Sequence, residues 1–158
     1  MAEYSANAVQ TVNPGESIVF TESPVPCERG FVRHRDDTGS FLLSGYVPRN
    51  GCNCNCNCNK NQSATYLVDF GANIAVPTGE AVGEISVAIA IDGTTVPTST
   101  MIVTPAAVEE YFNVSRAINV QIWKGCCETV TIRNTSDIPI LVQNANVLFD
   151  RRDLLYMR

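Results

Sequence analysis

A chain of 158 residues with a formal net charge of −5 is long enough for one domain with a substantial hydrophobic core. Acidic residues outnumber basic ones, 16 to 11, and no basic stripe interleaved with aromatic residues is present, which argues against nucleic-acid binding. Charged residues make up only 17% of the chain, below the roughly 25% of average soluble proteins. We therefore expect copies of the chain to cover part of its surface.

Strand patterns separated by short turns fill most of the chain. The clearest is 84–92, where isoleucine and valine occupy every second position, as in a half-buried strand. Residues 31–35 and 40–47 flank an Asp-Asp-Thr-Gly turn and predict a hairpin. Residues 105–112 are the only helical candidate, short enough to be a single turn or a loop. The remaining predicted strands are 8–12, 17–21, 65–76, 94–103, 114–124, 128–134 and 138–149, and the pair 114–124 and 128–134 is predicted to form a second hairpin.

The first seven residues lack a core pattern, and we expect an N-terminal arm over residues 1–7 ahead of a single domain over residues 8–158. Tyr4 and the alternating alanines could form an extra strand that pairs with the open edge of a neighbouring copy, and a frayed terminus is the alternative. The segment has neither a basic start nor an apolar run, so we do not expect a signal peptide. No apolar stretch approaches the roughly 20 residues of a membrane-spanning helix.

A loop rich in cysteine and asparagine, residues 50–63, is the most unusual segment. It contains no apolar residue apart from its cysteines, so it predicts an exposed row of thiols. Three interpretations stay open: cross-linking between copies, metal binding if the loop curls, or a tolerated insertion with free thiols. Zinc sites usually have two to four residues between paired cysteines, whereas the loop has one, which does not favour the second interpretation. The cysteines of the loop are Cys52, Cys54, Cys56 and Cys58.

Three further cysteines lie outside this loop. Cys126 and Cys127 are adjacent, and adjacent cysteines rarely bond to each other because the geometry is poor. Cys27 is a candidate partner for either, and burial or free thiols are the alternative. The chain has seven cysteines, an odd number, so at least one stays free or bonds to another chain.

Catalytic patterns are weak, and we expect neither an enzyme nor a cofactor. His34 is the only histidine, and a strand-end histidine is most often a surface residue. The adjacent pairs Asp36-Asp37 and Glu109-Glu110 point to different sides, whereas paired-carboxylate chemistry needs convergence. Calcium at Asp36 and Asp37 lacks a supporting ligand spacing. Trp123, the sole tryptophan, follows an apolar strand and is expected to pack, which argues against a glycan-binding surface.

The order of these signals resembles a known family. An early Pro-Gly turn leads to Ile18-Val19-Phe20, the run Thr38-Gly39-Ser40-Phe41 opens a strand, and Tyr66–Phe70 and Val87–Gly93 follow. Over roughly residues 8–149 this resembles the TNF-like jelly roll, in particular the globular heads of complement-type collagenous proteins and their relatives on bacterial spores and phage. The resemblance implies an all-β, TNF-like jelly-roll β-sandwich of about ten strands, assembled as a compact homotrimer with its termini on one side. No Gly-X-Y stalk is present, so the attachment known for the spore relatives is not carried over.

Together these patterns predict a non-enzymatic structural subunit. We expect it to self-assemble through homotypic jelly-roll contacts on the outside of a virion or of a spore or cell surface, locked by cysteine cross-links. Seven cysteines without a secretion signal fit a protein made in the cytoplasm and exposed later by lysis. The alternatives are a trimeric head that binds a glycan or another host-surface ligand, and a cytosolic metal-thiolate protein.

Overall fold

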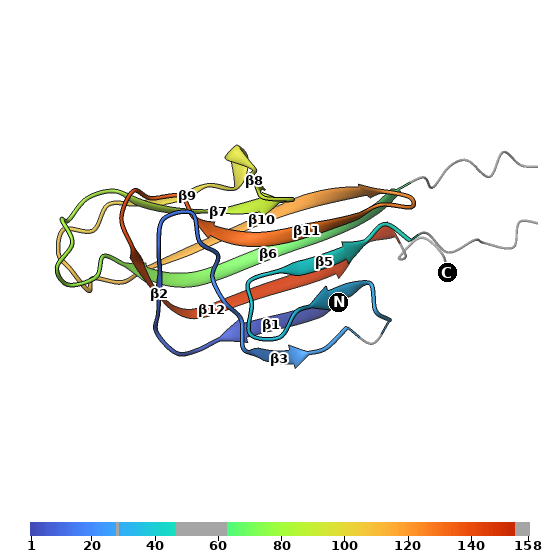
Figure 1. The fold of residues 1–158 in the computed structure, drawn as a ribbon, viewed down its shortest axis with the longest axis horizontal. Coiled ribbons are helices and arrows are strands. Elements are labelled where there is room, and N and C mark those ends of the chain that lie inside the picture. The colour runs from blue at the N-terminus through green and yellow to red at the C-terminus, as the bar shows by residue number, and fades with distance from the viewer. Residues whose placement is uncertain (28, 47–62, 154–158) are drawn as a thin grey trace, which may run out of the picture.

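The structure, a computed structural model, describes residues 1–27, 29–46 and 63–153. Two antiparallel six-stranded sheets pack face to face (Figure 1). Sheet A orders its strands β10 (Phe112–Trp123), β6 (Ser63–Ala75), β12 (Ile140–Arg151), β1 (Ala2–Ala6) and β3 (Glu22–Val25), and β2 (Gln10–Val12) also pairs with β12. Sheet B orders β4 (Val32–His34), β5 (Phe41–Ser44), β11 (Cys127–Asn134), β7 (Ile85–Ile91) and β8 (Thr94–Thr95), and β9 (Met101–Val103) also pairs with β7.

The core lies between the two sheets and follows from the alternation along each strand. In β6, Tyr66, Val68 and Phe70 are buried, whereas Asp69 between them is exposed. Because successive side chains point to opposite faces, one apolar residue in two suffices to line the interior. Phe41 of sheet B meets Phe149 of sheet A with ring centroids 4.8 Å apart. The two-sheet, all-β sandwich confirms the predicted fold class. Among residues 1–27, 29–46 and 63–153, no helix has the length and apolarity needed to cross a membrane.

The predicted hairpin of 114–124 with 128–134 is wrong. Both strands exist, as β10 and β11, but β10 pairs with β6 in sheet A and β11 pairs with β5 and β7 in sheet B. The turn through Gly125, which adopts a positive φ of 86°, therefore carries the chain from one sheet to the other. Turn residues alone do not distinguish a crossing of this kind from a hairpin.

Three other segments differ from the predicted elements. Residues 17–21 form only two isolated bridges, at Ser17 and Phe20, although Phe20 is fully buried. Residues 94–103 are interrupted by the 3₁₀ turn η2 (Pro97–Ser99), where the Ser99 hydroxyl bonds to the backbone of Ile89. Residues 104–111 form a loop without a helix.

The N-terminal segment is an integral strand of the domain. β1 lies between β12 and β3 in sheet A, and Ala2, Tyr4 and Ala6 are buried. The Tyr4 ring packs against Phe41, with centroids 4.9 Å apart. The structure thus places this segment inside the sheet of its own chain, and its exchange between copies stays a prediction.

Candidate functional site

One end of the sandwich carries the exposed cysteines Cys126 and Cys127, where the chain passes from β10 to β11. We call this the thiol end (Figure 1, right). Tyr46, the last described residue before the cysteine- and asparagine-rich loop, lies at this end. Ser63, the first described residue after residue 46, lies there too. The thiol end comprises Ser44–Tyr46, Ser63–Thr65, Trp123–Cys127 and Arg151–Asp153.

Backbone contacts hold these segments together. Cys127 pairs with Ser44 across β11 and β5, and Trp123 pairs with Ser63 across β10 and β6. The Gly45 N–H donates to the Cys126 carbonyl at 2.8 Å. Cys126 and Cys127 therefore lie directly beside both points where the loop leaves and rejoins the sandwich.

Gly45 is required for this close approach. A Cβ atom at this position would lie 2.3 Å from the Trp123 carbonyl oxygen and 2.5 Å from the Cys126 carbonyl oxygen. Both neighbours are backbone atoms that cannot move without disrupting the turn. Glycine thus lets the end of β5 pack against the turn that carries the two adjacent cysteines.

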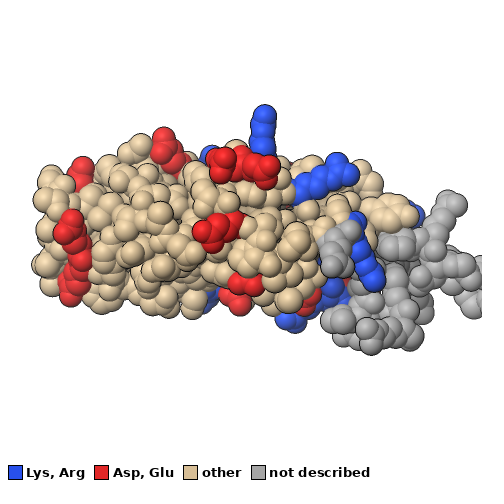
Figure 2. All heavy atoms as spheres, turned by 90° about the horizontal axis from the view of Figure 1, so that it is seen from below, with Lys and Arg blue, Asp and Glu red and all other residues tan. Residues whose placement is uncertain are grey.

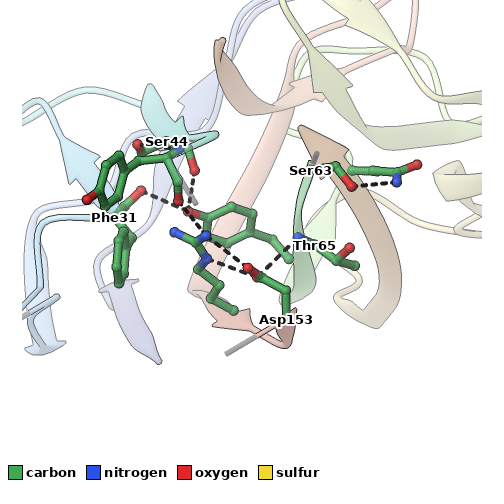
Figure 3. Close-up of polar contacts among 9 residues, drawn as sticks. Phe31, Ser44, Ser63, Thr65 and Asp153 are labelled. Atoms are coloured by element: carbon green, nitrogen blue, oxygen red, sulfur yellow. Dashed lines mark hydrogen bonds and ion pairs between the residues drawn. The ribbon is translucent and has the colours of Figure 1, made fainter. Parts of the chain in front are cut away.

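A buried ion pair fixes the chain on both sides of the loop (Figure 3). Arg151 donates two parallel hydrogen bonds to Asp153, each 2.9 Å long, and one more to the Tyr46 carbonyl. Asp153 in turn accepts a hydrogen bond of 3.3 Å from the Thr65 N–H. The paired geometry makes this a strong, charge-assisted contact. The pair thereby joins Tyr46, the last described residue before the loop, to β6, the strand that follows the loop.

Tyr66 supports the same end of the molecule from within the core. Its hydroxyl donates to the Ser44 carbonyl at 2.7 Å, and the Phe31 carbonyl lies 3.3 Å away (Figure 3). Burial raises the pKa of this hydroxyl to about 12, and the nearby Arg151 partly opposes that shift. The hydroxyl therefore remains a protonated donor. Arg151 also stacks over the Phe31 ring, 4.2 Å from its centroid.

Three of the seven candidate cysteines lie among the residues that the structure describes. Cys126 and Cys127 are exposed and Cys27 is half-buried; all three are free, so the pairing of Cys27 with either of the others is absent. Cys27 packs against the hydrophobic core. The four loop candidates lie outside the described residues: Cys52, Cys54, Cys56 and Cys58.

Trp123 does not pack into the core as expected. It is 58% exposed, and Tyr46 at the same end is 62% exposed. The reason is the alternation of β10: Ile122 takes the inward position, so Trp123 points outward with Gln121. The sequence pattern identified the apolar strand but not the side on which its last residue lies.

His34 packs against an aromatic ring of the core. Its ring stacks on Phe41 with centroids 4.6 Å apart, and its Nε2 lies 2.9 Å from the Thr38 carbonyl oxygen. The prediction of a surface histidine is therefore corrected to a half-buried one. Within the described ranges, no group of three or more histidine, cysteine, aspartate or glutamate side chains could hold a metal ion. Asp36 and Asp37 lie in the turn between β4 and β5 and, among the described residues, belong to no such group.

Comparisons with known proteins identify the fold. No family model matches the chain, and a search of curated proteins gives no match. Among solved structures, the globular domain of the zebrafish complement 1qA protein is similar over 93% of this chain and 94% of its own, at 12% identity and a TM-score of 0.57. The chain is therefore a TNF-like jelly-roll β-sandwich. At this identity the likeness extends to the fold alone.

Weaker likenesses include two carbohydrate-binding domains. The C-terminal domain of the sugar-binding protein EclA covers 92% of this chain and 79% of its own at 9% identity, with a TM-score of 0.40. A family 35 carbohydrate binding module from an environmental isolate covers 96% and 98% at 11% identity, with a TM-score of 0.35. Scores this low support no conclusion about function.

Proposed function

We propose that this chain is a non-enzymatic structural subunit that self-assembles on the outside of a virion or of a spore or cell surface, and that its thiol end cross-links the copies. The observation that carries the proposal is the gathering of Cys126, Cys127 and both ends of the cysteine-rich loop at one end of the sandwich. Thiols concentrated at one end meet the thiols of another copy wherever two such ends come together.

The described thiols are suited to bonds between copies. Cys126 and Cys127 are exposed, free and adjacent, so they have no good geometry for bonding to each other. Oxidation of one thiol from each of two copies forms one disulfide. Molecular oxygen takes up the two electrons and two protons and leaves as hydrogen peroxide. The reaction follows release from the reducing cytoplasm, so assembly precedes cross-linking.

The surface also fits a protein that contacts copies of itself. Uncharged residues cover most of the face shown in Figure 2. On that face, only acidic side chains appear at the end opposite the thiol end, whereas the basic ones lie toward the thiol end. The resemblance to TNF-like heads implies a homotrimer, and the proposal includes a trimer or a larger assembly built on it.

A second candidate function, glycan binding, is favoured by one observation. Trp123 and Tyr46 are both exposed at the thiol end, and exposed aromatic rings offer an apolar face with a polar edge to a sugar. Trp123 is the sole tryptophan, so its fluorescence reports directly on this end. A shift in this fluorescence on adding a glycan, absent in a Tyr46→Ala variant that keeps Trp123, would support this function.

Replacing the four loop cysteines by serine tests the proposal. We expect Cys52, Cys54, Cys56 and Cys58 to be dispensable for folding, because the core lies between the two sheets. The variant should keep its particle shape but lose the high-mass bands on non-reducing gels and part of its resistance to heat and detergent. A matched control replaces Cys126 and Cys127 instead and shows which set forms the bonds.

Metal binding gives a different result in the same experiment. Zinc or iron would then purify with the wild-type protein in stoichiometric amount and be lost in the serine variant. If a variant that lacks both sets of cysteines keeps the bands and the resistance, and no metal is lost, cross-linking through the thiol end is wrong.

A further inference from the structure

Strand β10 forms one edge of sheet A along its whole length. It pairs with β6 in an unbroken register from Phe112 opposite Ile74 to Trp123 opposite Ser63. Among the described residues no other strand pairs with it. Eight of its 12 residues are exposed, the highest share of any long strand in the sandwich. An edge strand of this length presents a row of backbone donors and acceptors.

The direction of the Thr65 backbone groups shows which residues of β10 point their N–H and carbonyl groups away from β6. The Thr65 N–H donates to Asp153 and the Thr65 carbonyl accepts from the Arg152 N–H, so both groups point toward β12. In an antiparallel sheet a residue directs both groups to the same neighbour, and the direction alternates along the strand. Gln121, opposite Thr65, therefore directs both groups away from β6. The same holds for every second residue of β10: Asn113, Ser115, Ala117, Asn119 and Gln121.

These backbone groups have no partner within the described part of the chain. No hydrogen bond there uses the backbone N–H or carbonyl of any of the five residues. Of the features that usually protect an edge, the strand has no proline, no lysine and no bulge, and it has a single inward-facing charge. This charge is Arg116, whose Nε donates to the Thr98 carbonyl of the turn η2 at 3.0 Å.

We propose that β10 is an interface between two copies of this chain, paired antiparallel about a twofold axis through Ala117. The proposal rests on the self-assembly proposed above and names the surface that takes part. In this register Ala117 faces the same residue of the second copy, Ser115 faces Asn119, and Asn113 faces Gln121. All five residues then exchange hydrogen bonds, about ten in total, and the two A sheets become continuous.

Charge and shape argue for a second copy as the occupant. The outward side chains of the five residues are small or uncharged, so the register places no like charges opposite each other. A groove of about 700 Å³ runs beside the middle of β10 and is lined by residues 115–119, by Asp69 and Thr98, and by the apolar side chains of Ile91 and Val96. In the proposed register, Ile118 of the second copy lies opposite Arg116, at this groove. An apolar side chain is thus offered to a partly apolar recess.

A pair of variants at Ala117 tests the interface. Ala117→Lys places two like charges together at the twofold axis, whereas Ala117→Thr keeps the strand neutral. Because Ala117 is exposed, both variants should remain folded, as circular dichroism would show. We expect light scattering in reducing buffer to show that Ala117→Lys reduces the particle mass to about half and that Ala117→Thr does not.

Hydrogen exchange locates the contact. In the wild-type assembly the amides of Ser115, Ala117 and Asn119 should be protected, and in Ala117→Lys they should exchange freely. The amides of Ile118 and Val120 bond to β6 and should be protected in both, which provides an internal control. The wild-type exchange pattern is informative by itself if Ala117→Lys fails to fold.

Three outcomes would overturn the proposal in different ways. An assembly whose mass is unchanged in Ala117→Lys, with fast exchange at Ser115, Ala117 and Asn119, excludes β10 as the interface and leaves self-assembly intact. A wild-type monomer with these amides protected shows that another part of the same chain covers the edge. A wild-type monomer with fast exchange there contradicts both the interface and the proposed function.

Discussion

Tyr66 is the residue that links the core to the thiol end. It is fully buried and belongs to β6, which lies between β10 and β12 in sheet A. Its hydroxyl donates to the Ser44 carbonyl at the end of β5 in sheet B. Its alternating position in β6 predicts burial, but nothing in the sequence indicates that its hydroxyl bonds to Ser44, 22 residues away. A buried hydroxyl must find such a partner, and only the packing of two sheets determines which one.

Replacing Tyr66 by phenylalanine should destabilise the fold by about 1–2 kcal/mol, because the Ser44 carbonyl loses its donor in a buried place. Chemical denaturation measures this difference. Tyr111→Phe is the matched control, since Tyr111 is partly exposed and removal of its hydroxyl should leave stability nearly unchanged. Equal stability of the two variants would show that the Tyr66 hydroxyl bond contributes little.

The same variant should change how stability depends on pH. The pKa of Tyr66 is raised from 10.0 to about 12 in the folded state, so the folded protein holds this proton more tightly than the unfolded chain. The contribution is fully present below pH 10 and is lost as the pH rises toward about 12. Tyr66→Phe should lack this part of the alkaline loss.

At the scale of elements, β1 gives the sharpest difference between sequence and structure. Five residues with mixed polarity carry too little pattern to distinguish a sheet strand from an arm. The structure places them between β12 and β3, with Tyr4 among the aromatic rings of the core. Long strands such as β6 and β7 could be predicted because their alternation extends over seven or more residues.

Deleting residues 2–6 should therefore unfold the domain, because it removes a central strand and exposes β12. Circular dichroism and thermal melting measure the loss. The control replaces Glu3, whose side chain lies on the outer face of β1, by glutamine, and should remain folded. A folded deletion variant with altered assembly would instead restore the interpretation of residues 1–7 as an exchanged arm.

The site shows a similar division between local and distant information. The sequence singled out the cysteines, because their spacing is unusual wherever they lie. It gave no indication of Arg151 and Asp153, which hold Tyr46 and Thr65 across separations of 105 and 88 residues. Contacts over such distances depend on the sheet order, which turn residues do not determine.

At the scale of the whole molecule, the two proposals use different surfaces for contacts between copies. The thiol end would supply covalent bonds, and the edge of β10, which has no partner strand among the described residues, would supply backbone hydrogen bonds. The first requires an oxidant and the second does not. We therefore expect the copies to assemble through hydrogen bonds in reducing conditions and to form disulfides after oxidation.

The molar mass of the purified protein in reducing buffer tests the central claim most directly. Reduction removes disulfides, so any mass above that of one chain reports non-covalent assembly. Light scattering at micromolar concentration should give a multiple of 17.2 kDa, consistent with a trimer or a larger assembly. A stable particle of 17.2 kDa would contradict the account of this chain as a self-assembling structural subunit.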